Sequence, residues 1–158
     1  MSVNAVKVHL MKYGMLDRLM EFSISSATVD LAAAAIGCTP GEIAKTISLY
    51  SDDGCILIVA AGDTKIDNKK FKETFSIKAK MLQAEDVPEL TGHPVGGVCP
   101  FAVGEKATVY LDESLKRFSY VYPACGAPNN CGKFTPQELE RVSECAGWVN
   151  VCKGKDAE

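Results

Sequence analysis

The stretch EIAKTISLYSDDGCILIVAAG, Glu42 to Gly62, carries the clearest fold signal in this 158-residue chain. Its first half, AKTISLY, is rich in β-branched residues and ends in an aromatic one, a composition typical of β-strands. Its second half, CILIVAAG, is a continuous apolar run of the length expected for a buried strand. Because the turn signal SDDG, Ser51 to Gly54, separates the two halves, they are expected to form a β-hairpin.

Helix start and stop signals recur on both sides of this hairpin. Thr28 is expected to cap the segment VDLAAAAI, which Gly37 would end, and Asp67 to cap the segment KKFKETF. The sequences TPGE and TPQE are capping boxes, and each opens a further helix. Helices are therefore predicted at residues 3–11, 29–36 and 69–75, from Pro136 to Gly147, and in short segments after Thr39 and Asp86.

Further segments carry strand-like patterns, and they lie at residues 19–27, 78–84, 107–115, 118–126 and 148–152. Helices and strands are interleaved without a regular β–α–β rhythm, and the strands come in hairpins. We therefore predict an α/β fold of the α+β type, with a mixed, mostly antiparallel curved sheet or partly closed barrel and flanking helices. The length favours one domain spanning residues 1–158 with a sizeable core.

Composition and charge narrow the function classes. The net charge of −3 disfavours a protein that wraps a long nucleic-acid duplex, because such proteins carry a basic excess. No apolar run is long enough for a membrane helix and the first residues lack the features of a signal peptide, so we expect a cytoplasmic protein with no membrane partner. Seven cysteines with no C-x-x-C pair fit reduced thiols, and neither a metal nor a cofactor is predicted.

The segment KIDNKKFKETFSIKAK, Lys65 to Lys80, contains six lysines. Lys65, Lys69 and Lys72 have the spacing that places side chains along one helical stripe. Two interpretations stay open, a patch that faces nucleic-acid phosphates or the solvated face of a helix. Since the net charge is negative, any nucleic-acid contact is expected to be local.

The segment TGHPVGGVCPF, Thr91 to Phe101, combines three glycines with two prolines. Gly96 and Gly97 allow the backbone to approach a ligand closely, and their N–H groups are suited to hold a carbonyl oxygen or an oxyanion. A tight turn between elements is the structural alternative. His93 is either a general base or a hydrogen-bonded loop residue, and Cys99 is either a nucleophile or a buried thiol.

Lys45 stands at the start of the predicted strand AKTISLY, among apolar neighbours. Such a lysine either extends its charge to solvent or lies in a pocket. The chain lacks a P-loop and the motifs G-x-G-x-x-G, G-x-S-x-G and H-E-x-x-H. From the residues alone, the sequence indicates a compact α/β domain with a glycine-lined site and a candidate lysine.

Five segments, in their order and spacing, resemble the YbaK-type family, the stand-alone relatives of the editing domain inserted in bacterial prolyl-tRNA synthetases. The resemblance covers nearly the full length, in SVNAVKVHL, EIAKTISLY, VAAGDTKIDNKKF, TGHPVGGVCPF and NNCGKFTPQEL. It implies a mixed α/β fold with a curved sheet and the activity of an aminoacyl-tRNA deacylase. Such an enzyme binds the acceptor end of a tRNA, classically the tRNA for proline, and removes a small mischarged residue such as cysteine or alanine.

The resemblance also implies the site. The family's motif lysine falls on Lys45, which would hold the 3′ end of the tRNA by charge, and its glycine loop would position the aminoacyl carbonyl with the backbone. No protein nucleophile is implied, because a water, a ribose hydroxyl or the substrate's own thiol can attack the ester. The predicted catalytic residues are Lys45, His93, Gly96 and Gly97. The predicted substrate-binding residues are Asp63, Gly92, Val95, Cys99, Pro100, Asn129 and Asn130.

Two departures from the family pattern bear on specificity. Cys99 stands where family members often carry serine or a small residue, and the late segment PACGAPNNCGKF is richer in cysteine. The amino-acid specificity is therefore not carried over from the relatives. Prolyl-tRNA synthetase is an expected partner of the deacylase. The alternatives are a non-catalytic module that binds tRNA ends or a synthetase, and a redox protein that uses one low-pKa thiol.

Overall fold

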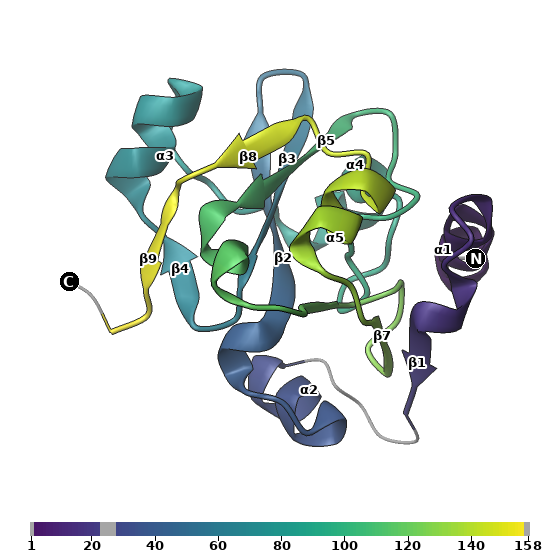
Figure 1. The fold of residues 1–158 in the computed structure, drawn as a ribbon. Helices are drawn as coiled ribbons and strands as arrows, with labels where there is room; N and C mark the ends of the chain where they lie inside the picture. The colour runs from purple at the N-terminus through teal and green to yellow at the C-terminus, as the bar shows by residue number, and fades with distance from the viewer. Residues whose placement is uncertain (1, 23–27, 157–158) are drawn as a thin grey trace.

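The computed structural model describes residues 2–22 and 28–156 (Figure 1). Its centre is a five-stranded sheet with the strand order β6-β2-β3-β5-β8, and it is flanked by two-stranded sheets of β1 with β7 and β4 with β9. The central strands are β2 (Ile43–Ser51), β3 (Gly54–Ala61), β5 (Ala107–Asp112), β6 (Tyr122–Pro123) and β8 (Gly147–Val149). The outer strands are β1 (Leu19–Glu21), β4 (Thr64–Ile66), β7 (Asn130–Gly132) and β9 (Cys152–Gly154).

The predicted hairpin forms the middle of the central sheet. β2 and β3 pair antiparallel from Ala44 opposite Ala61 to Ser51 opposite Gly54. β6 joins β2, and β5 and β8 follow β3, in parallel pairings, because long connections return the chain in the same direction. The prediction of a mixed, curved sheet with flanking helices is confirmed. Parallel pairing nevertheless has a larger share of the central sheet than the hairpin pattern indicated.

Both faces of β3 are buried, as its continuous apolar sequence predicts. Leu57 and Val59 belong to one hydrophobic core, whereas Ile56 and Ile58 belong to a second core around Phe71. The apolar residues of β3 are at most 6% exposed. Since successive side chains of a strand point to opposite faces, β3 lies between the two cores and contributes side chains to both.

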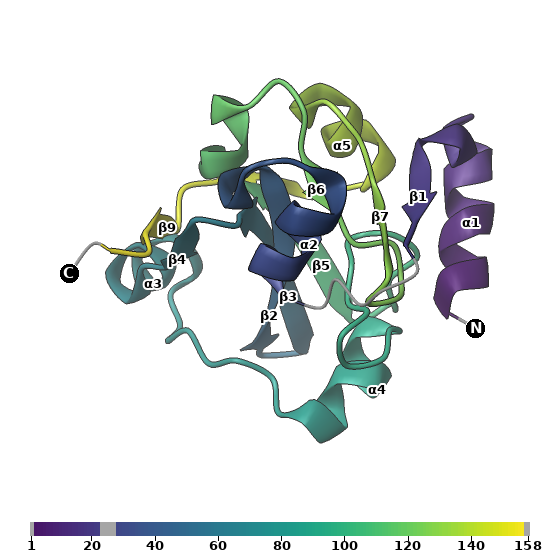
Figure 2. The ribbon, with the colours of Figure 1, turned by 90° about the horizontal axis from the view of Figure 1, so that it is seen from below.

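Helices cover both faces of the sheet. α1 and α5 pack on the first core through Val6 and Leu139, and α3 packs on the second through Phe71. α2 lies over the start of β2, where Ala32 contacts Ile43 (Figure 2). In residues 2–22 and 28–156, no helix is long and apolar enough to cross a lipid bilayer. The α-helices are α1 (Ser2–Lys12), α2 (Val29–Ile36), α3 (Asn68–Phe75), α4 (Val87–Thr91) and α5 (Pro136–Val142).

The capping contacts confirm the predicted starts of three helices. The Thr28 side chain accepts a hydrogen bond from the first turn of α2 at 3.1 Å, and Gly37 ends that helix in the left-handed region with a φ of 84°. The Asp67 carboxylate accepts from two N–H groups in the first turn of α3. Thr135 and Glu138 form the predicted capping box of α5.

Three predicted elements differ from the structure. Residues 78–84 form no strand, because their backbone pairs with β2 only through a bridge at Met81 before the chain turns into the 3₁₀ helix η3 (Ala84–Asp86). The last helix ends at Val142 instead of Gly147, since Glu144 has a left-handed φ of 55°. The predicted strand 148–152 is split between β8 and β9, because the Val151 N–H donates to the Asp112 carboxylate at 2.9 Å.

Other predicted elements are shorter than expected. β5 ends at Asp112, whose side chain caps the 3₁₀ helix η4 (Glu113–Arg117), and residues 118–126 contribute only β6. The Asp86 carboxylate accepts from the Tyr50 hydroxyl and does not cap α4. Of the predicted strand 19–27, β1 is present, and residues 23–27 lie outside the described residues.

The Arg18–Glu138 ion pair links the 3₁₀ helix η1 (Leu16–Arg18) to α5. Both terminal nitrogens of the guanidinium donate to the carboxylate, at 2.8 and 2.6 Å, and the pair is partly buried. This hydrogen bonding lowers the pKa of Glu138 from 4.5 to about 2. Because the folded-state pKa is depressed, the pair stabilises the fold above about pH 4.5, and the stabilisation is lost as the pH falls toward 2.

We expect Glu138→Gln to lower the free energy of unfolding at pH 7 by about 1–2 kcal/mol, because the charge is lost while the capping oxygen remains. Urea unfolding at pH 7 and pH 3 measures this difference, which should be smaller at the lower pH. The control is Glu113→Gln, which removes an exposed ion pair with Lys116 and should change stability by less than about 0.5 kcal/mol. Equal effects of the two variants would contradict the assignment.

Candidate functional site

A cavity of about 390 Å³ opens beside the outer edge of β2. Its wall comes from segments far apart in sequence, namely the start of α2, the first half of β2, and some of the residues within 81–87, 95–98 and 122–131. Most of the wall is apolar, with Val29 and Val98 among its residues, and Thr46 contributes a polar group. A concave, mainly apolar site with few polar groups is suited to a small chemical group.

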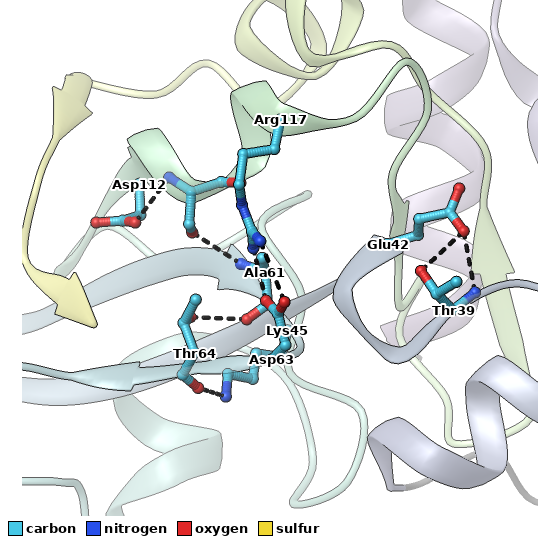
Figure 3. A network of polar contacts seen from close by, with 9 residues as sticks. Thr39, Glu42, Lys45, Ala61, Asp63, Thr64, Asp112 and Arg117 are labelled. Atoms are coloured by element: carbon cyan, nitrogen blue, oxygen red, sulfur yellow. Dashed lines mark hydrogen bonds and ion pairs between the residues drawn. The ribbon is translucent and has the colours of Figure 1, made fainter. Parts of the chain in front are cut away.

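Lys45 borders this cavity, but its ammonium group is turned toward β4 (Figure 3). The ammonium donates a hydrogen bond to the Thr64 carbonyl oxygen. Burial lowers the pKa of Lys45, and the charge of Lys155 lowers it further. Strand alternation explains this direction, since the Lys45 side chain leaves β2 on the face opposite to that of Thr46.

Hydrogen bonds hold the Thr64 carbonyl in place (Figure 3). The Thr64 hydroxyl donates to the Ala61 carbonyl oxygen at 2.7 Å, and the Ala61 N–H donates to the Ser114 hydroxyl at 3.1 Å. The Ser114 N–H in turn donates to the Asp112 carboxylate at 2.9 Å. The acceptor of the Lys45 ammonium is therefore anchored to β3 and η4.

Asp63 faces Arg117 and is not part of the cavity wall. The guanidinium donates to both carboxylate oxygens, at 2.6 and 3.1 Å, and this lowers the pKa of Asp63. Arg117 also lies over the Phe118 ring at 4.7 Å from its centroid. Asp63 thus anchors η4 beside β4 and supplies a negative charge near Lys45.

The glycines of the loop differ in what they do. Gly96 lines the cavity with a φ of +87°, and its amide has no hydrogen-bond partner among the described residues. The Gly97 amide donates to the Pro94 carbonyl at 2.9 Å, so it is already used within the loop. A Cβ at Gly97 would lie 2.6 Å from the Gly126 carbonyl oxygen, so only glycine allows these two loops to touch. Gly92 ends α4 with a φ of +82°.

His93 and Cys99 lie behind the loop and away from the cavity wall. The His93 side chain is 1% exposed, with Nε2 at 2.7 Å from the Phe101 carbonyl oxygen, and burial lowers its pKa. The Cys99 sulfur is 3.5 Å from the same Nε2, and burial raises the pKa of this thiol to about 12. Pro100 is buried beside them. These residues support the loop from behind.

Asn129 and Asn130 form side-chain hydrogen bonds with backbone groups of the chain. The Asn130 side chain accepts from the Cys125 and Ala127 N–H groups, at 3.2 and 3.3 Å, and donates to the Cys125 carbonyl at 3.1 Å. Asn130 therefore shapes residues 125–130 where they border the cavity. Asn129 instead donates to the Phe22 carbonyl at 3.2 Å, next to β1.

The structure brings some of the predicted site residues together and separates others. The cavity wall contains Lys45, Val95, Gly96 and Asn130. Outside the wall lie Asp63, Gly92, His93, Gly97, Cys99, Pro100 and Asn129. The functional roles of both groups stay predictions. The sequence reasoning missed Thr46, which follows the candidate Lys45 directly in β2 and lines the cavity. Its position next to Lys45 was the available signal.

Four of the seven thiols do not fit a redox site. Burial raises the pKa of Cys55 to about 11, and that of Cys99, Cys131 and Cys152 to about 12. A protonated thiol is a poor nucleophile, so these four cysteines lack the low pKa that the redox alternative requires. In the described part of the chain, no group of three potential metal ligands occurs.

The elements α3, β4 and β9 lie at one end of the molecule (Figure 1), and each of them carries lysines. Lys65 lies opposite Lys153 in the antiparallel β4–β9 pair, and Lys155 is close enough to lower the pKa of Lys45. None of them forms an ion pair with a described residue. We name this set the lysine surface, and it comprises Lys65, Lys69, Lys72, Lys153 and Lys155.

Comparison with known sequences identifies relatives of this chain. Residues 25–142 match the family model described as the aminoacyl-tRNA editing domain. The chain is 49% identical over 154 residues to the uncharacterized protein YwhH of Bacillus subtilis, covering 97% of this chain and 98% of that protein. It is also 26% identical over 93 residues to the proline–tRNA ligase of Bacillus licheniformis, covering 58% of this chain and 16% of the ligase.

Solved structures share the fold over almost the whole chain. A candidate trans-editing enzyme for prolyl tRNA synthetase superposes with a TM-score of 0.86 at 28% identity, covering 97% of this chain and 98% of that one. The hypothetical protein APE2540 superposes with a TM-score of 0.83 at 29% identity, covering 94% and 99%. The cavity beside β2 therefore lies in a fold shared with a protein described in terms of tRNA editing.

We expect Gly97→Ala to lower the free energy of unfolding by about 1–3 kcal/mol, because its Cβ would press on the Gly126 carbonyl and separate the two loops. Thermal unfolding of the variant measures this effect. Gly154→Ala is the matched control, since no atom of the described residues, its chain neighbours aside, lies within 4 Å of the added Cβ. If both variants unfold at the same temperature as the wild type, the close loop contact is not needed for stability.

Proposed function

The chain belongs to the family of aminoacyl-tRNA editing domains, and from this premise we propose that it is a trans-acting deacylase. The substrate is a tRNA that carries a wrong small amino acid, with cysteine or alanine on the tRNA for proline as the first candidates. Hydrolysis of the ester releases the amino acid and the free tRNA. We further propose that residues 1–158 form one editing domain of the YbaK type, which acts in the cytoplasm and cooperates with prolyl-tRNA synthetase.

The cavity beside β2 is the observation that carries this proposal. An aminoacyl group at the end of a single-stranded tRNA terminus can enter a space of about 390 Å³ that excludes a duplex. The ester is already activated, so positioning and stabilisation of the developing oxyanion can supply much of the rate. With His93 and Cys99 buried behind the loop, attack by a water, a ribose hydroxyl or the substrate's own thiol fits better than attack by the protein.

We assign roles to individual residues according to whether their polar groups are already hydrogen-bonded within the protein. We assign the Gly96 amide to the ester carbonyl, because the Gly97 amide is used by Pro94. Lys45 is assigned to the terminal nucleotide. To reach it, the flexible Lys45 side chain must leave the Thr64 carbonyl and turn around the edge of β2. His93 acts through its support of the loop. The apolar wall limits the size of the amino acid, since overpacking against fixed walls is costly, and so spares the tRNA's correct proline.

Lys45→Ala tests the proposal together with a panel of charged tRNAs. The tRNA for proline is charged with cysteine, alanine, serine or proline, and the release of each amino acid is timed. We expect rapid release of one small residue, retention of proline, and a loss of at least about tenfold in kcat/KM for Lys45→Ala. Lys106→Ala, an exposed lysine outside the cavity wall, is the control. A fully active Lys45→Ala would remove this lysine from the mechanism.

The rival function is a non-catalytic module that binds tRNA ends or a synthetase. One result would identify this rival: the protein binds a non-hydrolysable aminoacyl-adenosine but hydrolyses no ester in the panel. The Gly96 amide beside the cavity, which has no hydrogen-bond partner in the part of the chain that the structure describes, favours the deacylase, because it is a group that can stabilise an oxyanion.

The lysine surface is proposed to contact the phosphates of the acceptor stem. It adjoins Lys45, and its cations are not neutralised by ion pairs with described residues. We expect Lys65→Gln combined with Lys153→Gln to reduce kcat/KM for a charged tRNA and to make its salt dependence shallower by about two phosphate contacts. Activity on a minimal aminoacyl-adenosine ester should not change. The same result from Lys106→Gln combined with Lys133→Gln would contradict a local contact.

A further inference from the structure

Among the described residues, the outer edge of β2 has no hydrogen-bonded neighbour at Thr46, beside the cavity. At the start of the strand, Ala44 is covered by its pairing with β6. Toward the end of the strand, the Ser48 carbonyl and the Tyr50 N–H are hydrogen-bonded to residues 80–82, at 3.1 and 2.8 Å. Thr46 lies between these covered positions and is part of the cavity wall.

The N–H and C=O of Thr46 point out of the sheet at this position. In an antiparallel pair, the residues of a strand alternate between turning both polar groups toward the partner strand and turning both away from it. Ser48 and Tyr50 turn theirs away from β3, so Thr46, two residues earlier, does the same. The opposite strand agrees, because the Ala61 N–H turns away from β2 and donates to Ser114.

The Thr46 hydroxyl is a third polar group of this residue that has no partner among the described residues. Its oxygen atom is buried. Such groups are few in folded proteins because each one costs free energy. Valine has the same shape and the same preference for strands without this cost. A hydroxyl retained at this position is explained if a ligand completes its hydrogen bonding.

We propose that Thr46 binds the aminoacyl group of the substrate as if that group were a strand of one residue. This inference rests on the proposed deacylase function and names the contact that orients its substrate. A residue at an open edge exchanges hydrogen bonds with the N–H and the C=O of one neighbouring residue. An aminoacyl ester carries the same two groups, an α-ammonium and a carbonyl, on either side of one carbon atom.

The hydrogen bonds then have definite partners. The Thr46 C=O accepts from the α-ammonium, and the Thr46 N–H donates to the ester carbonyl oxygen. A second N–H of the ammonium donates to the Thr46 hydroxyl once the side chain rotates to turn its buried oxygen toward the cavity. Because a carbonyl oxygen has two lone pairs, it can accept from Thr46 on one side and from Gly96 on the other, and both residues line the cavity. The site therefore selects esters of α-amino acids with a free ammonium group.

Thr46→Val separates this role from a structural one, because it removes the hydroxyl and keeps the shape. We expect kcat/KM for the hydrolysed aminoacyl-tRNA to fall at least about tenfold, while the Tm equals or exceeds that of the wild type. Thr46→Ser keeps the hydroxyl and should keep most of the activity. A Thr46→Val variant with full activity, or one that loses stability along with activity, would overturn the role of the hydroxyl.

Amide hydrogen exchange tests the backbone contact without any need for turnover. The probe is 3′-alanylamino-3′-deoxyadenosine, in which an amide replaces the ester. We expect the Thr46 amide to exchange fast in the free protein and at least about tenfold more slowly with the probe bound. The amides of Lys45 and Ile47 face β3 and are the internal controls, protected in both states.

The two experiments together distinguish the inference from the proposed function. Protection of the Thr46 amide in a protein that hydrolyses no ester would support the inference and contradict the deacylase. Hydrolysis of a charged tRNA with no change at the Thr46 amide would overturn the inference and leave the deacylase intact. Lack of both protection and hydrolysis would overturn both.

Discussion

Burial of β3 on both faces is the constraint on which the rest of the structure depends. Its alternate side chains enter two cores made of different residues, and the two-residue turn between Ser51 and Gly54 fixes how β2 and β3 pair. If β3 slipped by one residue along β2, the β3 side chains that now enter one core would enter the other. The register of the hairpin is therefore strongly specified. This register sends Lys45 to one face of β2 and leaves Thr46 with its backbone groups at the open edge.

The local parts of the fold were predictable from the sequence, because they depend on nearby residues. The central hairpin and the caps at Thr28, Asp67 and Thr135 are of this kind. The errors arise where a distant segment decides the outcome. Residues 78–84 have a strand-like pattern, but only one bridge to β2 is available to them, and the Asp112 carboxylate interrupts the last strand by binding the Val151 N–H.

The sequence predicted which segments form the candidate site, but it predicted less well which of their residues line the cavity. The glycine-rich motif does reach the cavity, through Val95, Gly96 and Val98. Its remaining residues support the loop, and the motif alone could not show this, because the Gly97 contact is with Gly126 and the His93 contact is with Phe101. Thr46 was missed for a related reason. Which residue of an edge strand lacks a partner depends on the segments that cover the edge on either side.

The central claim is that the aminoacyl group lies between the open edge of β2 and the Gly96 loop. A crystal structure with 3′-alanylamino-3′-deoxyadenosine bound tests it most directly. The account predicts the alanyl carbonyl oxygen within hydrogen-bonding distance, about 2.7–3.2 Å, of the Thr46 and Gly96 amide nitrogens, with the ammonium against the Thr46 carbonyl. An alanyl group bound at any other surface of the protein, or one in the cavity that makes no contact with β2, would contradict the account.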